Sequence, residues 1–91
     1  MRIRWTTPAA DDLQYIYNYL RENYSARARS TIAEIHASIR SLKKFPHRGR
    51  KGNDEGTRGL PHSQLPYIIV YRIADEVVEI LHIWHGAQDW Q

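Results

Sequence analysis

The sequence predicts a small α+β domain in which a helical hairpin packs on one face of a small antiparallel sheet. Its 91 residues are enough for one domain, spanning residues 1–91, and too few for two. Two segments with apolar residues at helical spacing follow one another directly, and three strand-like segments come after them. Helical segments followed by a run of strands favour the α+β class. The expected order is β-α-α-β-β-β, and its first strand must join the C-terminal sheet from a distance.

The first two elements are a short strand and a helix. Ile3 and Trp5 alternate with polar residues, so both share one face of a strand over residues 2–6. Thr7 is expected to cap the helix, with Pro8 at its first helical position. The apolar residues that follow form one stripe of an amphipathic helix: Leu13, Ile16, Tyr17, Leu20 and Tyr24.

The second helix follows almost without a linker, which predicts an αα-hairpin. Ser25 is expected to cap this helix and Pro46 to end it. Its apolar stripe comprises Ala28, Ile32, Ile35, Ile39, Leu42 and Phe45.

The remaining elements are a loop and three strands. Residues 46–56 form a polar loop punctuated by glycines. Strands are expected over residues 57–60, 67–73 and 77–84, and the turn at residues 74–76 makes a hairpin of the last two. The segment 67–73 is nearly all apolar, as expected of a strand central in its sheet.

The positive charge is concentrated in the middle of the chain. The formal net charge is +3, and residues 25–56 carry eight basic residues against three acidic ones. Such a surface attracts nucleic acid or an acidic partner protein, although a solvated helix face would have the same composition. The chain contains no cysteine, and its longest apolar run, at residues 68–71, is far too short for a membrane span. We therefore expect a cytoplasmic protein that does not enter the membrane.

Most catalytic motifs are missing. The glycines form no phosphate-binding loop, and no HExxH motif or thiolate ligand exists, so the sequence predicts no metal, cofactor or small-molecule substrate. Metal-free RNA cleavage needs a base, an acid and cations for the phosphate. The C-terminal strands offer Arg58, Arg72, His82 and His85 for these roles, although the two histidines, three residues apart, should point to opposite faces. The competing interpretation is that the arginines pair with Glu76, Glu79 or Asp89 across the strands.

The C-terminal tail has two interpretations. Gly86 ends the last strand, and Trp90 lies one residue from the end. Trp90 either folds back on the thin core or stays exposed as an anchor for a partner protein, because tryptophan is enriched in binding hot spots.

Five segments of the chain carry a recognisable pattern. They are residues 3–13 (Ile-Arg-Trp-Thr-x-x-Ala-x-x-Asp-Leu), 45–49 (Phe-Pro-His-Arg-Gly), 57–61 (Thr-Arg-Gly-Leu-Pro), 66–73 (Pro-Tyr-Ile-Ile-Val-Tyr-Arg-Ile) and 81–90 (Leu-His-Ile-Trp-His-Gly-Ala-Gln-Asp-Trp). Together these segments resemble the RelE/ParE toxin superfamily, closer to its ParE-like branch. The resemblance covers essentially the whole chain, and it implies the toxin of a type II toxin–antitoxin pair of the plasmid-stabilisation kind, neutralised by a small antitoxin.

The resemblance implies two alternative targets. RelE-like members are ribosome-dependent mRNA endoribonucleases with basic residues at the positions that Ile68 and Gln88 occupy here, so that active site does not carry over. ParE-like members poison DNA gyrase, and their toxicity is attributed largely to the C-terminal region. The leading hypothesis is therefore a non-catalytic toxin that arrests growth by binding gyrase, and a member that has lost its toxicity is a third alternative. The expected target-binding residues are His85, Gln88, Asp89 and Trp90 of the tail and Arg48, Arg50 and Lys51 of the basic loop.

The antitoxin is expected to bind beside the helical hairpin or at a free sheet edge. A groove along two helices accepts an amphipathic helix, and a free edge accepts an added strand. The candidate contacts on the hairpin are Leu13, Tyr17, Ile35 and Ile39.

Overall fold

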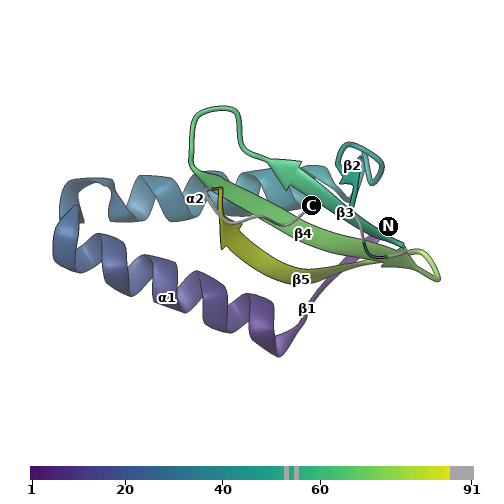
Figure 1. Cartoon of the computed structure of the whole chain (residues 1–91), viewed down its shortest axis with the longest axis horizontal. Coiled ribbons are helices and arrows are strands. Elements are labelled where there is room, and N and C mark those ends of the chain that lie inside the picture. The colour runs from purple at the N-terminus through teal and green to yellow at the C-terminus, as the bar shows by residue number, and fades with distance from the viewer. Residues whose placement is uncertain (53, 55, 87–91) are drawn as a thin grey trace.

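A computed structural model describes residues 1–52, 54 and 56–86 (Figure 1). Two helices pack against a five-stranded sheet; in Figure 1, α2 runs behind the sheet and α1 lies below it, beside β5. The predicted α+β class and the helical hairpin are confirmed. The elements in chain order are β1 (Arg2–Trp5), α1 (Thr7–Asn23), α2 (Ser25–Ser41), β2 (Arg50–Lys51), β3 (Thr57–Pro61), β4 (Tyr67–Ala74) and β5 (Val77–His85).

The sheet is mixed, where the sequence predicted an antiparallel one. Its strand order is β1-β5-β4-β3-β2, and β1 runs parallel to β5 while every other neighbouring pair is antiparallel. The parallel pair is possible because the whole helical hairpin separates the two strands along the chain. The short strand β2 lies within the segment predicted as a loop, and it pairs with β3 at the sheet edge.

Two helix caps differ from the prediction by one residue. Thr6, not Thr7, caps α1: its hydroxyl accepts a hydrogen bond from the Ala9 N–H at 3.3 Å and donates one to the Ile80 carbonyl at 2.7 Å. Tyr24 occupies the cap position of α2, with no side-chain hydrogen bond, so Ser25 is already helical. The cap at Thr6 therefore also joins the start of α1 to β5.

The second helix ends earlier than its apolar stripe suggested. Regular α-helix stops at Ser41, and a turn follows before Pro46. Phe45 lies beyond the helix and is 55% exposed, so it does not extend the buried stripe.

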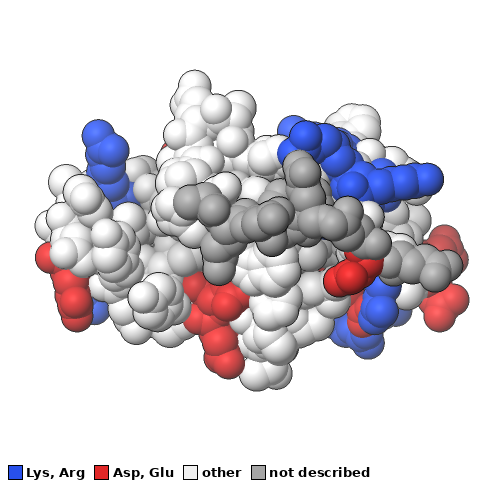
Figure 2. Space-filling model, in the orientation of Figure 1, with Lys and Arg blue, Asp and Glu red and all other residues white. Residues whose placement is uncertain are grey.

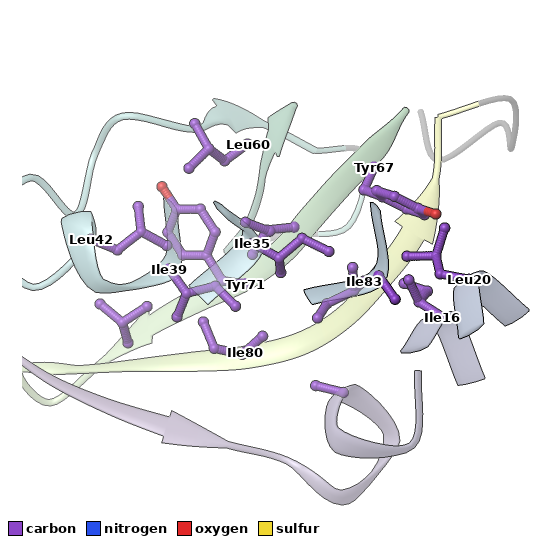
Figure 3. Packing of buried hydrophobic residues seen from close by; sticks show 14 residues of the cluster. Ile16, Leu20, Ile35, Ile39, Leu42, Leu60, Tyr67, Tyr71, Ile80 and Ile83 are labelled. Atoms are coloured by element: carbon purple, nitrogen blue, oxygen red, sulfur yellow. The ribbon is translucent and has the colours of Figure 1, made fainter. Parts of the chain in front are cut away.

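The core lies between the hairpin and the inner face of the sheet (Figure 3). Burying these aliphatic and aromatic groups supplies the main driving force for folding. Its largest fully buried side chains are Tyr71, Ile35, Ile39, Leu42, Ile80 and Val78.

Within the described residues, no helix has the length and apolar character that crossing a bilayer would require.

Candidate functional site

An open groove with aromatic walls lies between α1, the start of α2 and the end of β5. Its volume is about 770 Å³, and we call it the aromatic groove. Tyr15, Tyr19 and Tyr24 on its helical side are 73%, 47% and 54% exposed, which is unusual for such large rings. Tyr67 faces them from β4, where burial, with a smaller contribution from Tyr19, raises the pKa of its phenol above the ordinary value. Exposed aromatic side chains gathered in one concave surface are typical of a binding site.

The free edge of β5 forms one wall of the aromatic groove. Strand β1 pairs with β5 only as far as Ile80. Among the described residues, the backbone groups of β5 beyond Ile80 that point away from β4 therefore have no neighbouring strand. Asp12 of α1 supplies an acceptor at this edge instead. One of its carboxylate oxygens accepts a hydrogen bond from the Ile83 N–H at 3.0 Å and lies 3.0 Å from His82 Nδ1. The His82 ring stacks on Trp84 with its centroid 5.0 Å away. The Asp12 carboxylate thus satisfies one backbone N–H of this edge and also holds the His82 imidazole.

Replacing Asp12 with alanine should loosen this edge. The variant leaves the partly buried Ile83 N–H without its acceptor, which should cost about 1–2 kcal/mol of unfolding free energy. Amide hydrogen exchange at Ile83 should accelerate while exchange in the middle of β4 changes little. Asp11→Ala is the matched control, because Asp11 is the neighbouring exposed carboxylate. Equal exchange rates at Ile83 in both variants would contradict the role given to Asp12.

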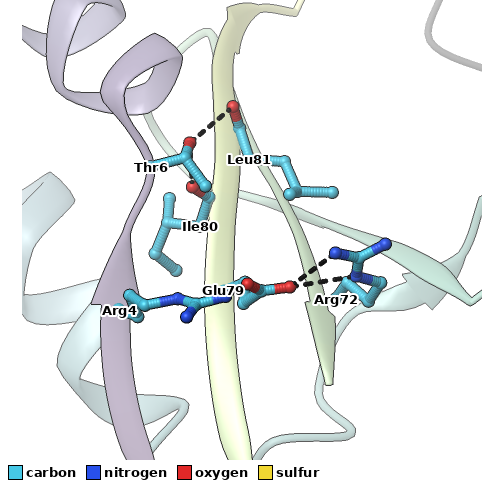
Figure 4. Close-up of polar contacts among 6 residues, drawn as sticks. All are labelled: Arg4, Thr6, Arg72, Glu79, Ile80 and Leu81. Carbon is cyan, nitrogen blue, oxygen red and sulfur yellow. Dashed lines mark hydrogen bonds and ion pairs between the residues drawn. The ribbon is translucent and has the colours of Figure 1, made fainter. Parts of the chain in front are cut away.

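The two arginines predicted for RNA cleavage lie on opposite faces of the sheet. Arg58 pairs in register with Tyr71, whose ring is in the core, whereas Arg72 alternates to the outer face. Arg72 donates two hydrogen bonds to Glu79, at 2.6 and 3.1 Å, and Arg4 reaches the other oxygen of the same carboxylate (Figure 4). The predicted pairing of Arg72 with Glu79 is therefore confirmed. Arg58 instead donates to the Gly49 carbonyl at 2.8 Å.

The two histidines are also apart, as predicted. Beyond the bulge in β5, His82 and Trp84 share one side of the strand, and Ile83 and His85 share the other. The His85 ring meets Tyr67 edge-on with centroids 5.9 Å apart. The four residues proposed for catalysis do not converge on one point.

The tail can be followed to Gly86, whose N–H donates to the Pro66 carbonyl. The predicted target-binding residues Gln88, Asp89 and Trp90 lie outside the described residues, whereas His85, at the last position of β5, is exposed.

The basic loop is held on the sheet by one buried phenol. The Tyr71 hydroxyl accepts from the Gly49 N–H at 2.9 Å and donates to the Pro46 carbonyl at 2.6 Å. A Cβ at Gly49 would lie 2.7 Å from the same hydroxyl, so the loop packs this closely only with glycine there. Lysine and arginine side chains gather over β2 at this end of the sheet (Figure 2). The predicted target-binding residues of this loop, Arg48, Arg50 and Lys51, are all exposed.

Of the four residues predicted to contact an antitoxin, two are fully buried and two are half-buried. Ile35 and Ile39 are 1% and 2% exposed and belong to the core, because the inner face of α2 packs directly on the sheet. Leu13 and Tyr17 are half-buried at the margin of the core. The exposed aromatic face of α1 is carried instead by Tyr15 and Tyr19, which lie off the stripe that the sequence singled out.

Among the residues that the structure describes, no group of three or more histidine, aspartate or glutamate side chains is placed to hold a metal ion. The polar groups of the site have protein partners: a buried carboxylate paired with arginines, a histidine on an aspartate, and a tyrosine on the backbone.

The chain is thus a small α+β protein with a two-helix hairpin on a mixed sheet, an aromatic groove at one end and a basic loop at the other. The model of the family described as "ParE toxin of type II toxin-antitoxin system, parDE" matches residues 3–90, and the chain belongs to this family. It is therefore a toxin of the type II toxin–antitoxin kind.

Individual relatives agree with the family. The chain is 38% identical to the "Putative toxin Y4kP" of Sinorhizobium fredii over 98% of its length and 92% of that protein. It is 30% identical to toxin RelE2 of Caulobacter vibrioides over 96% of its length and 97% of that protein.

Two solved structures share the fold. A chain of the chromosomal ParDE system from P. aeruginosa superposes with a TM-score of 0.85 and 25% identity, covering 93% of this chain and 95% of that one. A chain of the RelBE2 toxin–antitoxin complex from Mycobacterium tuberculosis gives a TM-score of 0.70 and 26% identity, covering 92% of this chain and 95% of that one. The superfamily resemblance inferred from the five sequence segments is confirmed.

Proposed function

We propose that this toxin arrests growth by binding and poisoning DNA gyrase, and that it does not cleave RNA. The observation that carries the proposal is the dispersal of its candidate catalytic groups. Arg72 neutralises Glu79, Arg58 holds the Gly49 carbonyl on the other face, and His82 and His85 lie on opposite sides of β5. General acid–base cleavage needs an acid, a base and a cation within reach of one phosphate, and this arrangement does not supply them.

The position occupied by an arginine in RelE-like members gives the same indication. Ile68 is 6% exposed and apolar, so it cannot neutralise a phosphate. A target protein would instead meet the exposed His85, the tail that follows it, and the basic loop.

The partner that neutralises the toxin is, in this proposal, an antitoxin with an apolar segment that covers the aromatic groove. The groove offers three exposed tyrosines, and the free edge of β5 lies along it. Covering these rings would bury the largest concentration of exposed aromatic surface in the described part of the chain. The positive segment 25–56 also favours an antitoxin with acidic residues around that apolar segment.

Deleting residues Gln88 to Gln91 should abolish growth arrest and leave antitoxin binding nearly unchanged. The reason is that the proposed target contact is in the tail, whereas the proposed antitoxin contact is in the aromatic groove. Growth after induction and co-purification with the antitoxin measure the two properties separately. A Tyr15→Ala/Tyr19→Ala variant is the reciprocal control and should lose antitoxin binding before it loses growth arrest. Growth arrest that survives the tail deletion would argue against gyrase binding through the tail.

Ribosome-dependent mRNA cleavage is the second candidate. It is favoured by the contact of Asp12 with His82 Nδ1, since a carboxylate in this position orients an imidazole for proton transfer. Induction would then halt translation with site-specific cuts in mRNA, and His82→Ala would prevent both effects. Intact mRNA in arrested cells would exclude this candidate.

A further inference from the structure

A second hollow lies between β1 and α2, away from the aromatic groove, and its rim is strongly cationic. Its volume is about 380 Å³, and we call it the cationic cleft. The rim carries Arg2 from β1 and Arg40 and Lys43 from α2 and the turn after it, all exposed. These three side chains converge because Arg40 and Lys43 lie one helical turn apart on the side of α2 that faces β1.

The cationic cleft has no counter-charge among the described residues. None of the residues that line it there is an aspartate or a glutamate. Within the described residues, Arg2, Arg40 and Lys43 form no ion pair with a carboxylate, whereas Arg4 and Arg72 share Glu79. Three like charges around one hollow repel each other, and an anion placed among them removes that repulsion.

The wall of the cationic cleft adds two flat rings to these charges. Trp5 and His36 face each other across β1 and α2 with ring centroids 5.5 Å apart at 48°. Both rings are half-buried, so each presents part of its surface to the hollow. Ile3 and Ile39 complete the lining with apolar side chains.

Cations beside half-exposed aromatic rings suit a ligand that carries both negative charges and flat rings. A nucleic-acid strand carries phosphates at regular spacing and bases that stack on aromatic side chains, and proteins that bind single strands combine these two features. An acidic peptide would use the charges but not the rings. We propose that the cationic cleft binds a single-stranded segment of nucleic acid, with phosphates on Arg2, Arg40 and Lys43 and a base against the Trp5–His36 pair.

This inference goes beyond the action on gyrase and does not depend on it. It gives the toxin a direct contact with nucleic acid through residues that belong neither to the aromatic groove nor to the predicted target-binding set. Its test uses only the purified chain and DNA, so its failure would leave the proposed gyrase contact untouched.

The test is the salt dependence of DNA binding. Fluorescence anisotropy of a labelled single-stranded DNA would be followed against salt concentration for the wild-type chain and for R2Q/R40Q/K43Q. Each phosphate contact contributes roughly 0.7 to the slope of log K against log salt for single strands, so the variant should lower the slope by about 2. The charge-matched control is R21Q/R27Q/R29Q, which also removes three exposed arginine charges but from the far end of the hairpin. The control should keep most of the wild-type slope.

Stacking is tested separately with His36→Ala, which leaves the three cations in place. Loss of base stacking should weaken binding about tenfold or more. Thermal unfolding of each variant would show that the fold is retained. Equal loss of slope in R2Q/R40Q/K43Q and R21Q/R27Q/R29Q, or an acidic peptide that binds the cleft as tightly as the DNA, would overturn the proposal.

Discussion

Replacing Tyr71 with phenylalanine should lower the unfolding free energy by about 2–6 kcal/mol, although it removes only one oxygen atom. The Tyr71 side chain is fully buried, and its hydroxyl is the partner of both the Gly49 N–H and the Pro46 carbonyl. Each group left without its partner should cost about 1–3 kcal/mol. The measurement is thermal or denaturant unfolding, with Tyr15→Phe as control because the Tyr15 ring is 73% exposed. A Tyr71 variant no less stable than the Tyr15 variant would show that the phenol does not hold the loop.

The same phenol gives the fold a sensitivity to alkali. Burial raises the pKa of Tyr71 above its ordinary value near 10, more than the Gly49 hydrogen bond and the nearby arginines lower it. A group whose folded pKa is raised contributes stability that is complete below the unfolded pKa and is lost as the pH rises through the folded pKa. Wild-type stability should therefore fall above about pH 10. Part of this loss should be absent in Tyr71→Phe, and the remainder is expected from Tyr67, whose pKa is also raised.

Removing both arginines from Glu79 should have a comparable effect. Glu79 is only 4% exposed, and Arg4 and Arg72 supply the positive charge on either side of it. The double variant Arg4→Met/Arg72→Met leaves a buried carboxylate without a partner, which should cost roughly 3 kcal/mol. For a chain of this size, that loss corresponds to a fall in Tm of ~12–24 °C.

Two comparisons make the expected loss specific to the buried charge. Either single variant should lose much less, because one arginine remains. Adding Glu79→Gln to the double variant should recover part of the lost stability, because the amide carries no charge. If Arg21→Met/Arg29→Met, on the exposed surface of the hairpin, destabilises the chain as much, pairing with Glu79 is not the cause.

Periodicity was sufficient to predict the α+β class. The stripes of the two helices and the apolar segment of β4 are local patterns, and the structure confirms them except at Tyr24 and Phe45, which lie outside the helices and are exposed. The parallel pairing of β1 with β5 could not be predicted, because it joins residues more than seventy positions apart and depends on how the hairpin packs. Strand β2 has only two residues, too few to give a period.

The site was less predictable than the fold. Opposite faces for His82 and His85 follow from strand alternation and were predicted correctly. The contact between Asp12 and Ile83 depends on β1 ending at Trp5, and no residue spacing in the sequence predicts where β1 ends. Asp12 belongs to α1, yet its carboxylate accepts a hydrogen bond from the edge of β5.

Two of the predicted antitoxin contacts are buried in the core. Ile35 and Ile39 were taken from an apolar stripe, and a stripe marks what a helix buries within its own chain. The partner surface proposed above is formed instead by tyrosines outside the stripe. Tyr15 and Tyr19 are large rings at positions that face solvent.

The most direct test of the proposed function compares two assays of the purified toxin. One follows supercoiling of plasmid DNA by purified gyrase, and the other follows translation of a defined mRNA in vitro, each with the full chain and with the chain lacking Gln88 to Gln91. Gyrase binding predicts that the full chain inhibits supercoiling or traps cleaved DNA, that the shortened chain does not, and that the mRNA stays intact with both. Unchanged supercoiling together with site-specific cleavage of mRNA on the ribosome would contradict it.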